Sequence, residues 1–299
     1  NTKYFECTYR PVIEFAPEPP AAQLSRVVPK QDAPRPHIVV VVGDDQGWAN
    51  VGYHNKGRVH TPHMDALAAN GVELDRYYAA WFCSPSRSSF MTGRTVNHAM
   101  MDSDHLWRGF TLMPAKFQSV GYATHHVGKW GIGCQCDWMK PAERGFNTSF
   151  GFLAAWTDHY TFKTPKAFSC KGVDLQETHE PAYGRVGNYS TFLWNDEVSR
   201  ILQEYHDNEY THPMFLYVAL AVMHGPVQAP KIYKTWYVEN NITSDRVENA
   251  MMSAGDDLLG NITKMLKQYG MWNNTLLVYV SDNGGTLGGN NYPLRGAKM

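Results

Sequence analysis

Apolar runs alternate along the chain with amphipathic stretches, which predicts strands that alternate with helices. Uninterrupted apolar or β-branched runs predict strands at 37–42, 122–127, 214–222 and 275–280, and a weaker run predicts one at 72–77. The first run lies between Pro36 and Gly43 and shows no polar alternation. Such a run is typical of a strand that is buried on both faces of a parallel sheet.

Helices are predicted at 62–69, 114–120, 189–207 and 244–269. The shortest signal is local: Thr61 is a potential N-cap, Pro62 suits the first helical position, and Gly71 follows the end. The longest helix has its apolar residues on one face. Strands that alternate with helices predict an α/β domain with a mostly parallel central sheet flanked by helices.

The rest of the chain lacks a regular period. Residues 134–187 are rich in aromatic, glycine and turn residues, and we expect loops and small strands over one end of the sheet. Residues 1–36 are rich in proline and are predicted to form an extended N-terminal arm, followed by one domain over residues 37–299.

Composition excludes several classes of protein. The 299 residues are 43% hydrophobic, as expected for a globular domain with a sizeable core. The net charge of -1 provides no basic field for nucleic acid or an acidic membrane. No apolar run reaches the roughly 18 residues of a transmembrane segment, and residues 1–30 lack the apolar core of a signal peptide, so we expect a mature or trimmed start.

Cysteines and glycosylation motifs favour the secretory route. The chain has five cysteines. If Cys83 is a reactive residue, the other four are enough for two disulfides, whose pairing the sequence does not determine: Cys7, Cys134, Cys136 and Cys170. Five asparagines precede Ser or Thr by two residues, more than the one or two expected by chance: Asn147, Asn188, Asn241, Asn261 and Asn273. Both features suit a secreted or lysosomal glycoprotein.

The run from Cys83 to Arg94 carries the most specific signal. It reads Cys-Ser-Pro-Ser-Arg-Ser-Ser-Phe-Met-Thr-Gly-Arg, and Ser86 is predicted to cap a helix that runs towards Thr92. Cys83 would then lie beside a helix N-terminus, where unpaired N–H groups and Arg87 stabilise negative charge. The alternative is an inert buried cysteine, which is common for a lone Cys.

Carboxylates follow two of the predicted strands. Asp44 and Asp45 come after the first, and Asp282 and Asn283 come after the last. Parallel strands bring their carboxyl ends to one edge of the sheet, where the three carboxylates would repel one another unless a cation neutralised them. Hard oxygen ligands of this kind suit Ca²⁺ or Mg²⁺, whereas Zn²⁺ prefers His and Cys. Taken alone, either of these two short sequences is also typical of a turn.

Cationic residues lie at other predicted strand ends and near the end of the chain. Lys129 occurs in Val-Gly-Lys-Trp-Gly, His224 in Met-His-Gly-Pro, and Lys298 in Pro-Leu-Arg-Gly-Ala-Lys. An anionic ester bound at this edge would need positive groups around its oxygens and a proton donor for its leaving oxygen. Taken singly, each of these residues is more typical of a solvated surface.

The cysteine run resembles the sulfatase signature, in which Cys-x-Pro-Ser-Arg is followed by Thr-Gly-Arg. The resemblance extends from about His37 to Lys298, is closest to the animal arylsulfatase B type, and includes Tyr53-His54, Arg144-Gly145-Phe146 and residues 217–230. It implies an alkaline-phosphatase-like fold and a sulfuric ester hydrolase. It further implies that a formylglycine-generating enzyme oxidises Cys83 to formylglycine, whose hydrate attacks the sulfur of a sulfated sugar or aryl ester.

The resemblance assigns roles to the candidate residues. It implies a calcium site formed by Asp44, Asp45, Asp282 and Asn283 together with the modified Cys83. Arg87 would stabilise the hydrated aldehyde, Lys129 and Lys298 would neutralise sulfate oxygens, and His224 would assist the leaving group. Arylsulfatase B relatives act on sulfated sugars of glycosaminoglycans.

Two departures from the family pattern favour alternatives. Relatives carry a histidine two residues after the lysine of Gly-Lys-Trp, where this chain has Gly131, and they continue past the Lys298 position into a small C-terminal domain, where this sequence ends at Met299. One alternative is a non-catalytic sulfatase-like protein that binds sulfated glycans or a partner. Another is hydrolysis of phosphate or phosphonate esters on the same fold.

Overall fold

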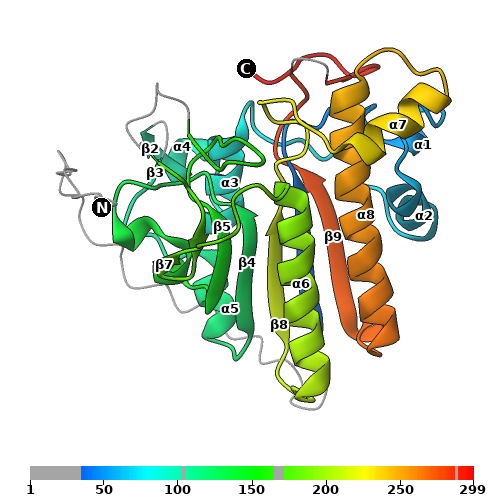
Figure 1. The fold of residues 1–299 in the computed structure, drawn as a ribbon. Coiled ribbons are helices and arrows are strands. Elements are labelled where there is room, and N and C mark those ends of the chain that lie inside the picture. Colours follow the sequence, from blue (N-terminus) through cyan, green and yellow to red (C-terminus); the bar gives the residue numbers. More distant parts are fainter. Residues whose placement is uncertain (1–34, 103–104, 165–171, 287–288) are drawn as a thin grey trace.

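The computed structural model describes residues 35–102, 105–164, 172–286 and 289–299, and Figure 1 shows their fold. Within these residues, seven strands form a central sheet in the order β7-β6-β5-β4-β8-β1-β9, and β2 and β3 form a small separate ladder. The predicted arm lies almost wholly outside the described residues.

The strands are bounded as follows: β1 His37–Gly43, β2 Met100–Asp102, β3 His105–Leu106, β4 Ala123–Lys129, β5 Thr148–Phe152, β6 Gln176–Glu177, β7 Glu180–Pro181, β8 Met214–Ala219 and β9 Thr275–Ser281. The helices are α1 Gly52–Asn55, α2 Pro62–Asn70, α3 Cys83–Thr92, α4 Val96–Ala99, α5 Met113–Gln118, α6 Ser190–Asp207, α7 Lys231–Glu239 and α8 Arg246–Gln268. Short 3-10 turns cover Asp137–Met139, Pro141–Arg144 and Trp272–Asn274.

The predicted parallel sheet is confirmed. β5, β4, β8, β1 and β9 pair in parallel, whereas β6 and β7 add an antiparallel edge. The four predicted helices and the four strong strands all form, with ends that shift by a few residues. The largest shift is in β8, which ends at Ala219 although the buried apolar run continues to Val222.

Both faces of the sheet are covered by helices. Val39 and Val41 of β1 pack towards the core that holds α6 and α8, and Val40 and Val42 pack towards the core that holds Met91 of α3. Figure 1 shows α6 and α8 lying along one face of the sheet. Burial on both faces explains the unbroken apolar run in β1, and it leaves the ends of the strands as the place for polar side chains.

The strand predicted at 72–77 is wrong. These residues form irregular, exposed structure, and the Val72 side chain is 88% exposed. No strand among the described residues pairs with them. Without a neighbouring ladder, their β-branched and aromatic content does not produce a strand.

β5, with the sequence Thr-Ser-Phe-Gly-Phe, lies in the segment for which loops and small strands were predicted, and it was not placed in the central sheet. Gly151 allows close approach to β4, since a Cβ atom there would lie 1.9 Å from the carbonyl oxygen of Gly128. Residues 134–187 therefore contribute a core strand as well as loops. α7 was also missed.

The structure places several of the predicted modification sites. Asn147, Asn188, Asn241 and Asn273 are exposed. The Asn261 amide instead donates to Asn195 Oδ1 and Ser199 Oγ at the contact between α8 and α6, so it is poorly placed for glycosylation. Cys136 is disulfide-bonded, whereas Cys7 and Cys170 lie outside the described residues. Among the described helices, none has the length and apolar character needed to cross a membrane.

Candidate active site

Cys83 is the first residue of α3. Phe82, in extended conformation, occupies the N-cap position, so the prediction that Ser86 caps this helix is wrong. Ser86 lies inside the helix, where its hydroxyl accepts a hydrogen bond from the Ala80 amide at 2.9 Å. Pro85 falls in the first turn, where the N–H that it lacks has no helical partner. The predicted position of the buried Cys83 beside a helix N-terminus is confirmed.

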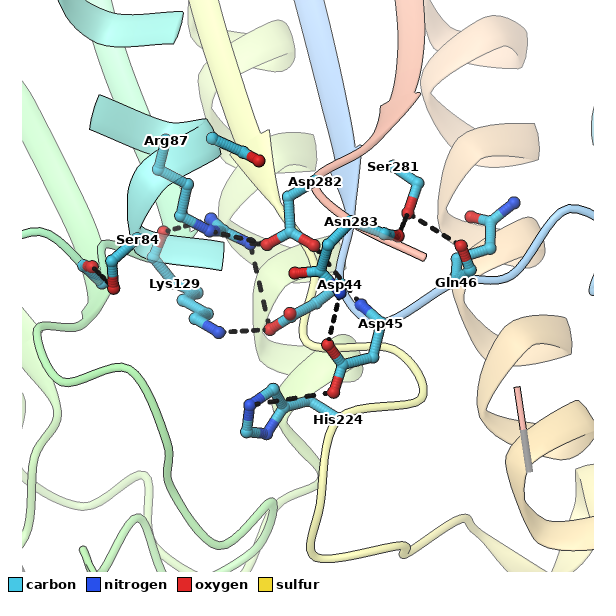
Figure 2. Close-up of polar contacts among 12 residues, drawn as sticks. Asp44, Asp45, Gln46, Ser84, Arg87, Lys129, His224, Ser281, Asp282 and Asn283 are labelled. Carbon is cyan, nitrogen blue, oxygen red and sulfur yellow. Dashed lines mark hydrogen bonds and ion pairs between the residues drawn. The ribbon is translucent and has the colours of Figure 1, made fainter. Parts of the chain in front are cut away.

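The ends of four adjacent strands supply the polar residues around Cys83. β1 leads into Asp44 and Asp45, β9 leads into Asp282, β4 ends in Lys129, and the segment after β8 carries His224. Figure 2 shows their side chains converging, together with Arg87 from α3. The edge of the sheet therefore gathers residues that are far apart in the sequence, as predicted.

Each carboxylate in this cluster has a cationic partner. Lys129 Nζ lies 2.5 Å from Asp44 Oδ2, Arg87 Nη2 lies 2.7 Å from Asp282 Oδ2, and Lys298 Nζ lies 2.7 Å from Asp45 Oδ1. All three carboxylates, Arg87 and Lys129 are buried. The carboxylates were expected to repel one another unless a cation neutralised them, and here cationic side chains from other parts of the chain offset three negative charges with three positive ones.

The pairings determine which groups are ionised. Burial opposes ionisation of Asp44, but Lys129, with His224 and Arg87, holds the pKa of Asp44 well below its usual range. Burial and the neighbouring Asp44 charge raise the pKa of Asp282 to about 7, and Arg87 offsets only part of this rise. The Asp44–Lys129 pair is thus charged, while Asp282 is the carboxyl whose ionised form a further cation would favour.

Two buried oxygen atoms indicate room for a cation. Asp44 Oδ1 and Asn283 Oδ1 have no hydrogen-bond partner among the described residues. Side-chain ligand atoms of Asp44, Cys83 and Asp282 lie within 4.8 Å of one another, as do those of Asp44, Asp45 and His224. Buried oxygens without a partner are costly, and coordination to a hard cation would satisfy them. The residues present therefore fit a calcium site.

Two glycines shape the Lys129 side of the cluster. Gly128 has φ +102°, and a Cβ atom there would lie 2.0 Å from the carbonyl oxygen of Ala219. Gly131 has φ +72°, and a Cβ atom there would lie 3.2 Å from Lys129 Cε and 3.4 Å from Arg87 Cδ. A side chain at position 131 would be strained and crowded, so the local backbone suits the glycine that this chain carries.

Two residues near the cluster were not singled out from the sequence. The Tyr217 hydroxyl accepts a hydrogen bond from Arg87 Nη1 at 3.4 Å. The ring of His159 contacts the backbone of His224. Tyr217 lies within an apolar strand and His159 within a segment without periodicity, so neither carried a signal that points to the site.

Comparison with known proteins identifies the family. The chain matches the family model described as Sulfatase over residues 36–299. It is 41% identical over 276 residues to Arylsulfatase J of Mus musculus, covering 88% of this chain and 45% of that protein. It is 28% identical over 285 residues to N-acetylgalactosamine-6-sulfatase of Mus musculus, covering 86% and 53%.

The solved structure of Ps i-CgsB in complex with k-i-k-neocarrahexaose superposes with a TM-score of 0.78 at 28% identity, covering 88% of this chain and 62% of that one. The chain belongs to the sulfatase family, and the resemblance and the fold class inferred from the sequence are confirmed. It spans about half the length of the curated relatives it matches.

Proposed function

We propose that this chain forms the catalytic part of a hydrolase that removes sulfate from a sulfated sugar or aryl ester. One observation carries the proposal: the Cys83 side chain lies at the N-terminus of α3, with ligand atoms of Asp44 and Asp282 within 4.8 Å. An anionic substrate group is stabilised at such a position by unpaired backbone N–H groups and by the buried cations nearby.

The proposed chemistry divides into a nucleophile, a cation and the surrounding side chains. Formylglycine derived from Cys83 supplies a hydroxyl nucleophile as its hydrate, and calcium held by Asp44, Asp45, Asp282 and Asn283, with the modified Cys83, supplies positive charge for a sulfate oxygen. Since the carboxylates and cationic side chains already balance, a divalent cation leaves the site with net positive charge. This charge suits a sulfate ester.

The remaining roles follow from where each side chain points. Lys129 and Lys298 bind Asp44 and Asp45 and can share their N–H donors with sulfate oxygens. Arg87 lies beside Cys83 on α3 and is positioned to stabilise the hydrated aldehyde. His224 donates from Nδ1 to the carbonyl of Gly225, and its Nε2 lies 3.9 Å from Asp45 Oδ2. Burial lowers the pKa of His224 to about 4, so Nε2 must take up a proton before it can donate to the leaving oxygen. The role of His224 as the group that assists the leaving group follows the family resemblance.

Homologues of sulfatase type support the same substrate class. Arylsulfatase J and N-acetylgalactosamine-6-sulfatase are named for sulfate esters. We infer a sulfated glycan or aryl substrate for this chain, passage through the secretory pathway to a secreted or lysosomal location, and maturation by a formylglycine-generating enzyme. A glycoprotein with exposed acceptor asparagines is consistent with this route.

Peptide mass spectrometry tests the modification directly. In protein purified from its native host, the peptide that contains Cys83 should be lighter than its sequence predicts. The reason is that the β-carbon of Cys83 loses its sulfur and becomes the carbon of an aldehyde. It should also react with a hydrazine probe. A fully unmodified thiol in that peptide would contradict the proposed mechanism. The peptide that contains Met91 serves as the unmodified reference.

Calcium binding is a second expected result. Asp44→Asn should weaken Ca²⁺ binding, measured by isothermal titration calorimetry, roughly 100-fold or more, since even residues behind a metal's ligands contribute 10- to 100-fold. Asp207→Asn is the matched control, because Asp207 is an exposed carboxylate at the last residue of α6 and belongs to neither carboxylate group around Asp44. Equal weakening in both variants, or none in Asp44→Asn, would remove the metal from the proposal.

Gly131 favours one competing function. The histidine that relatives carry two residues after the lysine equivalent to Lys129 would be strained here, because Gly131 has φ +72° and a Cβ atom would lie 3.2 Å from Lys129 Cε. A non-catalytic protein that binds sulfated glycans would retain the cationic side chains without needing the modification. An unmodified Cys83 together with glycan binding would establish this alternative.

A further inference from the structure

His159 is a buried histidine whose two ring nitrogens both have partners. The side chain is 1% exposed. Nδ1 lies 2.9 Å from Ser190 Oγ, and Nε2 lies 3.2 Å from the backbone carbonyl oxygen of His224. In the tautomer that satisfies both contacts, Nδ1 accepts from the serine hydroxyl and Nε2–H donates to the carbonyl. Burial lowers the pKa of His159, which keeps the ring neutral with one donor and one acceptor.

Residues next to His159 and Ser190 also hold the loop that follows β8 through hydrogen bonds. The backbone N–H of His159 donates to Gln228 Oε1 at 2.9 Å, and Gln228 Nε2 donates to Asp158 Oδ2 at 2.8 Å. The Tyr189 hydroxyl donates to the carbonyl of Gln228 at 3.0 Å. The loop is therefore held at His224 by the ring of His159 and at Gln228 by its neighbours.

The contact at His224 differs from an ordinary core hydrogen bond because it acts on the residue that carries the chemistry. His224 also donates from its own Nδ1 to the next carbonyl, that of Gly225, at 2.8 Å. His159 therefore holds the carbonyl of His224 and Gly225 holds its ring, while His224 Nε2 lies 3.9 Å from Asp45 Oδ2 in the carboxylate cluster. Ser190, the first residue of α6, in turn orients the His159 ring.

We propose that His159 is a positioning residue that aims His224 at the leaving oxygen of the substrate. This inference rests on the proposed function. His159 itself touches no reacting atom: it acts through the backbone of His224. A displacement of about 1 Å in a catalytic group can lower the rate roughly 100-fold, so the hydrogen bond can matter far more for turnover than for stability.

The dependence on the leaving group separates positioning from a structural role. Assistance at the leaving oxygen matters most when the alcohol is a poor leaving group. His159→Leu should therefore lower kcat/KM for phenyl sulfate at least about 10-fold more than for 4-nitrophenyl sulfate, whose phenolate leaves easily. His159→Gln, which keeps a donor and an acceptor, should recover part of the difference. A purely structural role would lower both rates equally.

A matched control and a double mutant sharpen the result. His125→Gln alters another largely buried histidine, which contacts Thr148 Oγ1 at 2.8 Å, and it should leave the ratio of the two substrates unchanged. Adding His159→Leu to His224→Ala should cost no more than His224→Ala alone, since the two residues act as one unit. Additive losses would overturn the inference.

The outcomes distinguish the two proposals. If the wild-type protein hydrolyses neither ester nor any sulfated sugar, the proposed function fails. If His224→Ala changes the ratio and His159→Leu does not, only the positioning role fails. Amide hydrogen exchange over residues 220–228 gives a measurement that needs no substrate. His159→Leu should speed exchange in this loop, whereas His125→Gln should not. Equal exchange in His159→Leu and the wild type would contradict the claim that His159 holds the loop.

Discussion

Cys83→Ala is expected to lower turnover of a sulfate ester roughly 1,000-fold or more while leaving the fold intact. Removal of a nucleophile has effects of this size in other hydrolases. Alanine fits the site because Cys83 is a small buried residue at the first position of α3, and the helix does not depend on its side chain for a cap hydrogen bond. Rates should be measured with the wild type and Cys83→Ala purified side by side, with thermal unfolding recorded for each.

The controls decide what a loss of activity means. Cys83→Ser should be equally inactive, because a serine at this position cannot be converted into formylglycine by oxidation of a thiol. Ser89 lies on the same helix, and its hydroxyl has no hydrogen-bond partner among the described residues. The activity of Ser89→Ala should therefore remain near that of the wild type. Full activity in Cys83→Ala or Cys83→Ser would exclude Cys83 as the source of the nucleophile.

The convergence of the site could be predicted from the sequence because it depends on backbone topology. Asp44 and Asp282 directly follow β-branched runs, and parallel pairing of β1 with β9 brings such positions to the same edge. The position of Cys83 beside a helix N-terminus was also predicted, although the expected N-cap was Ser86 and the helix in fact begins at Cys83 after Phe82.

The pairing within the site could not be predicted, because it depends on where side chains point. Asp44 and its partner Lys129 are 85 residues apart, and Arg87 and Asp282 are 195 residues apart. The sequence around each carboxylate contains no Lys or Arg, so it did not show which cationic side chains offset these charges. β5 was not placed in the sheet for a related reason. Gly151 is needed for close approach of β5 to β4, but a glycine weakens the sequence pattern that predicts a strand.

The largest effect on stability is expected for Arg87→Met. Arg87 is buried between Asp282, the carbonyl of Lys129 and the hydroxyl of Tyr217. Burial opposes its charge, but Asp282 raises the pKa of Arg87 above its usual value, so it is a permanent cation. Removing it leaves Asp282 buried without its partner, which costs about 3–5 kcal/mol in comparable pairs. Urea unfolding in the presence of a calcium chelator should show this loss in the free energy of unfolding.

A double-mutant cycle tests whether the unpaired charge is the cause. Arg87→Met combined with Asp282→Asn removes both charges, so its loss should be smaller than the sum of the two single losses by roughly 1 kcal/mol or more. Loss of packing around the aliphatic stem of Arg87 would instead give additive effects. Because the guanidinium lies beside Cys83 and Asp282 is a proposed calcium ligand, neither the single nor the double mutant should be active. Recovered stability in the inactive double mutant would show that the unpaired charge, and not the chemistry of the site, causes the loss of stability in Arg87→Met.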